Sequence, residues 1–202
     1  MSKEKGQSHQ KSLATRQSTQ PDAALAGDLV NRGARLLREG KAIEAIPLLQ
    51  QAVEIDADNV SAALNLGGAY VMAGKHRLAV PILEEALKKE PLNPMVWINL
   101  GAACLDRPPY MTPEGEERAI QAFERALELD PAAPSVSYNL GLICKDRGEL
   151  EKALDHFQHA VQTHPGDRDA HYWIRLLQTE IEKRRQGDDL TDPTGKEDHP
   201  VV

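Results

Sequence analysis

The stretch that decides the fold runs from Val60 to Asn93 and reads VSAALNLGGAYVMAGKHRLAVPILEEALKKEPLN. Its first half places small and apolar residues at i, i+3, i+4 and i+7, the spacing of one face of an α-helix, and these residues are Ala63, Leu66, Gly67 and Tyr70. A second face follows at i, i+4 and i+7, formed by Ala79, Leu83 and Ala86. Gly74 lies between the two faces, and Pro91 follows the second. The pattern therefore predicts two helices joined by a tight turn.

The same pattern recurs along the chain. The glycine of the first helix recurs as Gly33, Gly67, Gly101 and Gly141, and an alanine of the second helix recurs as Ala45, Ala79, Ala119 and Ala153. The interval is 34 residues except in the third unit, where it is 40. The four units are 26–59, 60–93, 94–133 and 134–167.

A helix hairpin repeated every 34 residues resembles the tetratricopeptide repeat (TPR). The resemblance implies an all-α fold, an α-solenoid of four helix hairpins wound into a right-handed superhelix. Contacts in such a solenoid are made mainly between neighbouring repeats. We expect the solenoid to span residues 23–185.

The last part of the solenoid, 168–185, keeps the helical phase but has no second helix after it. Arg175 falls where the repeats have glycine, which would block a following helix. We therefore expect a capping helix that covers the open end of the fourth repeat with its apolar residues, which are Tyr172, Trp173, Ile174, Leu176, Leu177 and Ile181. The flanking segments, 1–22 and the acidic 186–202, have little to bury, and we expect both to be disordered tails.

Composition narrows the possible partners and locations. The net charge of −7 argues against a nucleic-acid partner, and no apolar run is long enough to predict a membrane span. The N-terminus shows no apolar segment of a secretory signal. Cys104 and Cys144 fall on the buried face of first helices in adjacent repeats, too far apart for a disulfide. We expect a cytoplasmic protein with two core cysteines.

The third unit carries its six extra residues between its two helices, within 106–114. Thr112 followed by Pro113 predicts an N-cap and a first-turn proline, so the second helix should begin early. The insertion is either a tolerated loop or a lip at the edge of a binding groove, with Tyr110 and Met111 as contacts.

No pattern of catalytic or metal-binding residues is present. The chain lacks a phosphate-binding loop, a dinucleotide fingerprint and zinc-type Cys/His spacing. His156 and His159 share a helix face but have no third ligand in view, so a solvated pair is the better interpretation. We expect no cofactor, no metal and no enzymatic activity.

The resemblance implies that the first helices line a concave groove. The residue two positions before the repeat glycine is asparagine in every repeat: Asn31, Asn65, Asn99 and Asn139. Asparagine is a poor helix former, so its recurrence needs a reason. A ladder of carboxamides could pair with the backbone amides of an extended peptide, because each has a donor and an acceptor. The alternative is a local role in helix packing.

The positions just before the asparagines would form a groove wall that changes from aliphatic to aromatic along the chain: Val30, Leu64, Ile98, Tyr138 and Tyr172. Tyrosine suits a binding surface because it combines area with a polar tip. The alternative is that these side chains pack between neighbouring first helices.

One specific TPR function can be tested on the residues. The clamp that holds the acidic C-terminus of heat-shock chaperones needs lysine and arginine at set groove positions. The clamp positions hold Val30, Ala34, Asn65, Met95 and Asn99, or, one repeat further on, Leu64, Gly68, Asn99, Ser135 and Asn139. Every cation is missing, which argues against this clamp. We therefore predict a non-catalytic protein-interaction module that binds an extended segment of a protein or peptide partner. The alternative is a self-assembling scaffold subunit.

Overall fold

The computed structural model describes residues 20–105 and 112–188. These residues form helices and no strands. The helices are α1 (Gln20–Arg38), α2 (Ala42–Ile55), α3 (Val60–Met72), α4 (His76–Lys89), α5 (Pro94–Cys104), α6 (Pro113–Leu129), α7 (Pro134–Asp146), α8 (Leu150–Thr163) and α9 (Arg168–Asp188).

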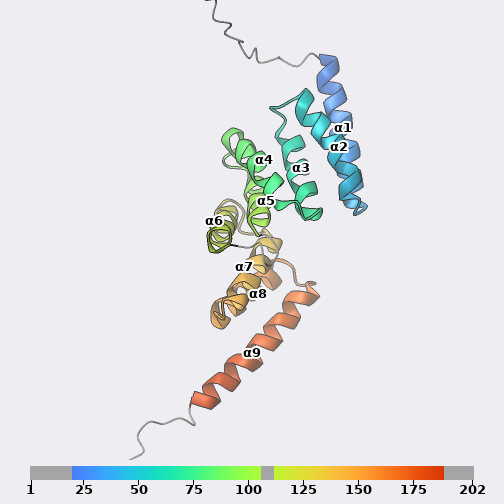
Figure 1. Cartoon of the computed structure of the whole chain (residues 1–202). Helices are drawn as coiled ribbons and strands as arrows, with labels where there is room; N and C mark the ends of the chain where they lie inside the picture. The colour runs from blue at the N-terminus through green and yellow to red at the C-terminus, as the bar shows by residue number, and fades with distance from the viewer. Residues whose placement is uncertain (1–19, 106–111, 189–202) are drawn as a thin grey trace, which may run out of the picture.

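The helices pair into four successive hairpins, α1–α2, α3–α4, α5–α6 and α7–α8, followed by the single helix α9 (Figure 1). The second, third and fourth hairpins fall within the predicted units and the first begins ahead of its unit, so the all-α solenoid is confirmed. The ends of the solenoid differ from the prediction by a few residues. α1 already begins at Gln20, within the segment expected to be a tail, and α9 continues to Asp188 instead of ending at 185.

Side chains at the helix starts explain several of these bounds. The Asn59 side-chain oxygen accepts from the backbone N–H of Ala62 at 2.9 Å. Thr112 Oγ1 accepts from Gly115 N–H at 3.0 Å, and Asp167 Oδ1 accepts from Ala170 N–H at 2.9 Å. Each bond satisfies a donor that the first turn of a helix leaves unpaired. The N-cap predicted at Thr112 is therefore confirmed, and α6 begins early, with Pro113 in its first turn.

The close contact within each hairpin is made at the repeat glycine. A Cβ placed on Gly67 would lie 2.7 Å from Leu83 Cδ2, and one on Gly101 would lie 2.6 Å from Phe123 Cε1. Gly33 faces Leu49 and Gly141 faces Phe157 in the same way. The four facing side chains are fully buried, with exposed fractions of 0%. Only glycine lets the large side chain of the second helix reach the backbone of the first.

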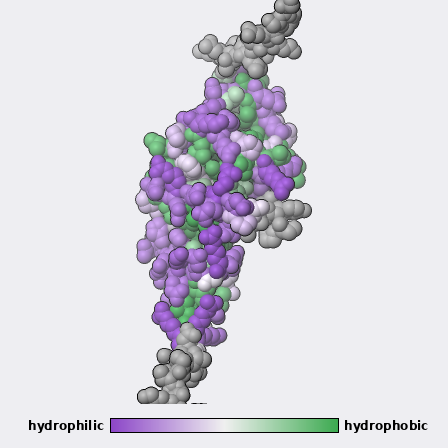
Figure 2. Space-filling view, turned by 60° about the vertical axis from the view of Figure 1, so that its left-hand side comes forward, coloured by the Kyte–Doolittle hydropathy of each residue, from purple (hydrophilic) through white to green (hydrophobic). Residues whose placement is uncertain are grey.

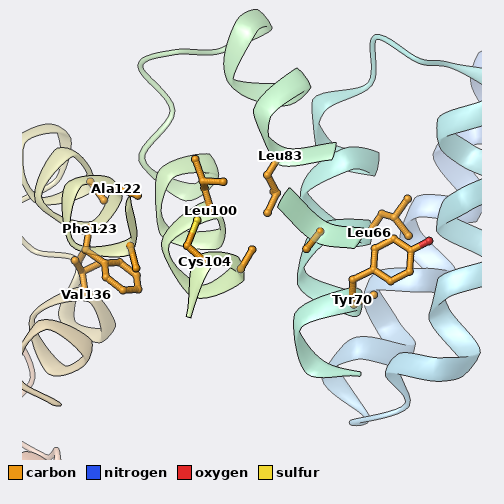
Figure 3. Close-up of a cluster of buried hydrophobic side chains, with 14 of the residues drawn as sticks. Leu66, Tyr70, Leu83, Leu100, Cys104, Ala122, Phe123 and Val136 are labelled. Carbon is orange, nitrogen blue, oxygen red and sulfur yellow. The ribbon is translucent and has the colours of Figure 1, made fainter. Parts of the chain in front are cut away.

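These contacts belong to an apolar core that runs through the solenoid. One cluster extends from α2 to α7, and Figure 3 shows part of it, from Leu66 and Tyr70 in α3 to Phe123 in α6 and Val136 in α7. A second cluster joins α7, α8 and α9. The core thus continues from one repeat into the next, as neighbour-to-neighbour packing requires.

α9 covers the end of the fourth repeat with only part of its apolar surface. Leu177 and Ile181 are 3% and 6% exposed, and the Trp173 ring stacks on Phe157 with centroids 6.1 Å apart. The prediction that Tyr172 and Leu176 also cover this end is wrong, because they are 53% and 45% exposed. The residues expected to cover the end occupy more than one side of the helix, and only one side meets α8.

The glycine contact can be tested on two adjacent glycines of α3. We expect Gly67→Ala to destabilise the protein, because overpacking a core typically costs about 1–3 kcal/mol. Gly68→Ala is the matched control: its Cβ would find only Asn99 Oδ1, at 4.0 Å. There alanine should stabilise by up to about 1 kcal/mol through its helix propensity. Urea unfolding of both variants measures the difference, and equal free energies of unfolding would contradict the assigned contact.

The cap can be tested on two adjacent leucines of α9. We expect Leu177→Ala to cost about 2–5 kcal/mol, because it leaves a cavity between α9 and α8. Leu176→Ala, on the exposed side, should stay within about 0.5 kcal/mol of the parent. Thermal unfolding followed by circular dichroism checks both values. A larger loss of unfolding free energy for Leu176→Ala than for Leu177→Ala would mean that the Leu176 side of α9, and not the Leu177 side, packs on the solenoid.

Candidate functional site

The first helices of the repeats do not form one uniform row. α1 contacts α3 and α3 contacts α5 directly, whereas α7 meets the third repeat mainly through α6. Arg147, just after α7, adds an ion pair across this junction, 2.6 Å from Glu116 of α6. The first helices therefore contact one another from α1 to α5, and this direct contact weakens before α7.

The four predicted ladder residues lie in different environments. Asn31 is exposed, and Asn65, Asn99 and Asn139 are half-buried. The Asn65 carboxamide donates from Nδ2 to the Ser61 carbonyl of its own helix at 2.9 Å. Among the described residues, the carboxamides of the other three have no hydrogen-bond partner. The local role therefore applies to Asn65, and the remaining asparagines keep unused donors and acceptors.

Asn99 lies where two first helices meet. Its Oδ1 atom would lie 4.0 Å from a Cβ on Gly68, which stands one turn after Asn65 on α3. The absence of a side chain at Gly68 leaves room for the Asn99 carboxamide at the α3–α5 contact. Asn65 and Asn99 are therefore placed on adjacent, touching helices.

The predicted groove wall is packed more tightly than the sequence suggested. Leu64 and Ile98 are half-buried against the main core cluster. Both therefore contribute to packing between helices, as the alternative interpretation holds. Each still has part of its side chain open to solvent.

The aromatic end of the wall is a cluster shared by α7, α8 and α9. The Tyr138 ring meets Phe157 edge-on at 5.4 Å, and Trp173 Nε1 donates to the Tyr138 hydroxyl at 3.3 Å. Tyr172 packs edge-on against Trp173 at 5.3 Å and stays 53% exposed. Tyr138 thus ties the cap to the fourth repeat, and Tyr172 is the tyrosine of this end that remains available for contact.

A cation also lies at this end and was missed by the sequence analysis. Lys145 Nζ is 5.0 Å from the centroid of the Trp173 ring and forms a hydrogen bond to Asp146. Lys145 stands seven residues after Tyr138, on the same face of α7, and this spacing is the signal that could have found it. A lysine that is paired with the neighbouring aspartate therefore lies beside the aromatic end.

The two histidines of α8 are not the solvated pair that we expected. Both are half-buried, and His159 Nδ1 lies 2.7 Å from Ser137 Oγ, whose residue is fully buried in α7. Burial lowers the pKa of His156 from its ordinary value. No group of three or more potential metal ligands occurs within 20–105 and 112–188. His159 therefore joins α8 to α7.

The cysteines are both free, with Cys104 buried and Cys144 half-buried, and burial raises the pKa of each thiol. A raised pKa leaves little thiolate at neutral pH, which fits core residues better than reactive ones. The proposed contacts Tyr110 and Met111 lie outside the described residues.

The face in Figure 2 is mostly hydrophilic, with apolar patches interrupted by charged side chains. Within the described parts of the chain, no helix has the length and apolar character needed to cross a membrane.

Comparisons with known proteins agree with this architecture. Two family models, both described as tetratricopeptide repeat, match residues 36–104 and 117–168, and together they cover more than half of the chain. A comparison with curated protein sequences finds no match.

Solved structures show the same fold. A crystal structure of MamA is 25% identical and superposes with a TM-score of 0.62 over 78% of this chain and 88% of that one. A MamA fragment from Desulfovibrio magneticus RS-1 is 20% identical, with a TM-score of 0.57 over 71% and 77%. YrrB, described as a TPR protein with an unusual peptide-binding site, is 23% identical, with a TM-score of 0.57 over 79% of each chain.

The half-buried imidazole of His156 gives a pH prediction. Its pKa is lowered in the folded state from 6.5, so the unfolded chain takes up the proton first as the pH falls. This contribution to stability is fully present above the unfolded pKa and is lost as the pH falls towards the folded pKa. We expect His156→Gln to flatten the dependence of the unfolding free energy on pH between about pH 7 and about pH 5. The matched control is His164→Gln, at an exposed histidine. A slope unchanged in His156→Gln would show that this imidazole is not the group responsible.

Proposed function

The chain belongs to the tetratricopeptide repeat family, and on this premise we propose that it binds an extended segment of a partner protein along its first helices. The interaction is non-catalytic. The observation that carries the proposal is the set of unpaired carboxamides at Asn31, Asn99 and Asn139, which recur at one repeat position.

The chemistry of a carboxamide explains why a polypeptide backbone is the proposed ligand. Its NH₂ group matches a backbone carbonyl and its oxygen matches a backbone N–H, whatever side chain the partner residue carries. A polar side chain that has no partner in the folded protein can make these bonds in a complex, in exchange for bonds to water. Each bond to the partner contributes about 1 kcal/mol net.

The spacing of the helices sets the register of such a segment. Packed helices lie roughly 8–10 Å apart, and an extended chain rises about 3.3 Å per residue. Asn65 and Asn99, on the touching helices α3 and α5, would then meet backbone groups about three residues apart on the partner. Asn65 can take part through its oxygen, because its bond to Ser61 uses only the NH₂ group.

The apolar side chains beside the asparagines supply the rest of the surface. The exposed parts of Leu64 and Ile98 flank the α3–α5 portion, and Tyr138 and Tyr172 flank the portion near Asn139. Lys145 lies there too, paired with Asp146. We therefore propose a segment whose central part is bound through its backbone and whose end near α9 carries an apolar side chain.

The alternative is a scaffold subunit that associates with its own copies, and one observation favours it. Tyr172 and Leu176 lie one turn apart on α9 and are 53% and 45% exposed, so the solenoid ends in an apolar strip. Light scattering after size exclusion separates the two functions. A monomer at micromolar concentration disfavours the scaffold, and a concentration-dependent oligomer that Tyr172→Ser disrupts would favour it.

The groove is tested with a partner segment found by pull-down and mass spectrometry, then reduced to a synthetic peptide. We expect Asn99→Ala and Asn139→Ala each to weaken binding about fivefold, the equivalent of about 1 kcal/mol. Gln162→Ala, at an exposed position of the second helix α8, is the control and should leave the dissociation constant unchanged. Calorimetric titration gives the constants, and circular dichroism confirms the helicity of each variant. An unchanged affinity in the folded double variant would contradict the ladder.

A further inference from the structure

An apolar pocket of about 390 Å³ opens in the second repeat, away from the asparagine face. It lies where α2 is joined to α3, with the C-terminal half of α4 as its other wall. Its apolar lining is formed by Val53, Ala57, Val60, Ala63, Pro81, Ile82 and Ala86. A mainly apolar pocket of this size is in the range that holds a drug-sized or side-chain-sized ligand.

The residues equivalent to Ala63 in the other repeats show which side chains fit at this position. The position of Ala63 holds Trp97 in the third repeat and His171 at the start of α9. Trp97 Nε1 donates to the Pro91 carbonyl at 2.8 Å, and His171 Nε2 pairs with the Pro165 carbonyl at 2.9 Å. An aromatic ring whose N–H points at the carbonyl of a residue near the end of the preceding repeat thus occurs twice. For Ala63 of the second repeat the corresponding carbonyl is that of Ala57, near the end of the first repeat, and the ring is missing.

In the first and fourth repeats, other side chains fill or cover the position equivalent to Ala63. In the first repeat the position holds Leu29, which is 3% exposed. In the fourth it holds the small Ser137, but His159 of α8 lies over it at 2.7 Å. The counterpart of His159 in the second repeat is Glu85, which pairs with Lys88 at 2.5 Å on the surface. In the second repeat, therefore, Ala63 is too small to fill the place, and Glu85 does not cover it because it is paired with Lys88.

We propose that this pocket is an anchor site for a tryptophan side chain carried by a partner polypeptide. The indole ring would lie against Ala63, Val53 and Ile82, and its N–H would donate to the Ala57 carbonyl. That carbonyl already accepts from Lys89 Nζ, but a carbonyl oxygen has two lone pairs and can accept a second donor. The site does not rest on the asparagine ladder and can exist without it.

The charges at the mouth of the pocket favour a side chain within a polypeptide over free tryptophan. Lys89 Nζ is 2.7 Å from the Asp58 carboxylate, and Glu85 is paired with Lys88. A free amino acid would bring an ammonium and a carboxylate to a rim whose charges are already neutralised. A tryptophan inside a chain brings neither.

The first experiment titrates the isotope-labelled full chain with N-acetyl-L-tryptophanamide, a neutral mimic of a tryptophan residue, and records NMR spectra. We expect saturable shifts in the methyl signals of Ala63, Val53 and Ile82, with none from N-acetyl-L-alaninamide. Free tryptophan should bind more weakly than the amide. Absence of shifts at these methyls, or tighter binding of free tryptophan, would overturn the proposal.

The second experiment fills the pocket from within. Ala63→Trp copies the third repeat and Ala63→Leu copies the first, so both variants should melt at or above the temperature of the parent. Both should also lose the saturable shifts, whereas Leu176→Ala, on the exposed side of α9, should keep them. A folded Ala63→Leu or Ala63→Trp variant that still binds the amide at the remaining pocket methyls would overturn the assignment. A clear loss of stability in both variants would also overturn it, because the larger side chains would then find no open pocket at position 63.

Discussion

The structure depends on the contact between a glycine and a large apolar side chain inside each hairpin. At Gly67 the side chain of Leu83 approaches to a distance at which a methyl group would not fit, and Gly101 and Phe123 repeat the arrangement. The distance between the two helices of a hairpin is therefore set by the absence of one carbon atom. Because each hairpin also packs on the next, this local constraint fixes the spacing of the first helices and hence of any groove that they line.

The junction between the third and fourth repeats shows what happens when the pattern is interrupted. The third hairpin carries six extra residues, and α7 then meets the preceding repeat mainly through α6 instead of through α5. The ion pair of Arg147 with Glu116 lies at this junction, although an exposed pair of this kind contributes only about 0–1 kcal/mol. The result is a surface in two portions, one aliphatic over α3 and α5 and one aromatic at α7 and α9.

The periodic features of the fold could be predicted from the sequence, and the features that depend on one pair of residues could not. The repeat interval identified the repeat glycines, and the cap at Thr112 followed from its residue type and from the proline after it. Phase could not show that Tyr172 faces solvent or that Ser137 meets His159, because these outcomes depend on partners in another helix. The pocket at Ala63 was missed for the same reason: alanine there looks ordinary until Trp97 and the side-chain direction of Glu85 are compared with it.

The pocket at Ala63 also affects the register in which a partner segment would lie along the repeats. A row of equal repeats can bind a segment in several registers. A segment held by identical contacts can shift by one repeat and make the same contacts again. Backbone pairing by asparagines does not remove this ambiguity, since it ignores the partner's side chains. A pocket that selects one side chain, such as the one at Ala63, would remove the ambiguity by fixing the position of that side chain. A partner that used both surfaces would be held in a single alignment, with one of its residues assigned to the second repeat.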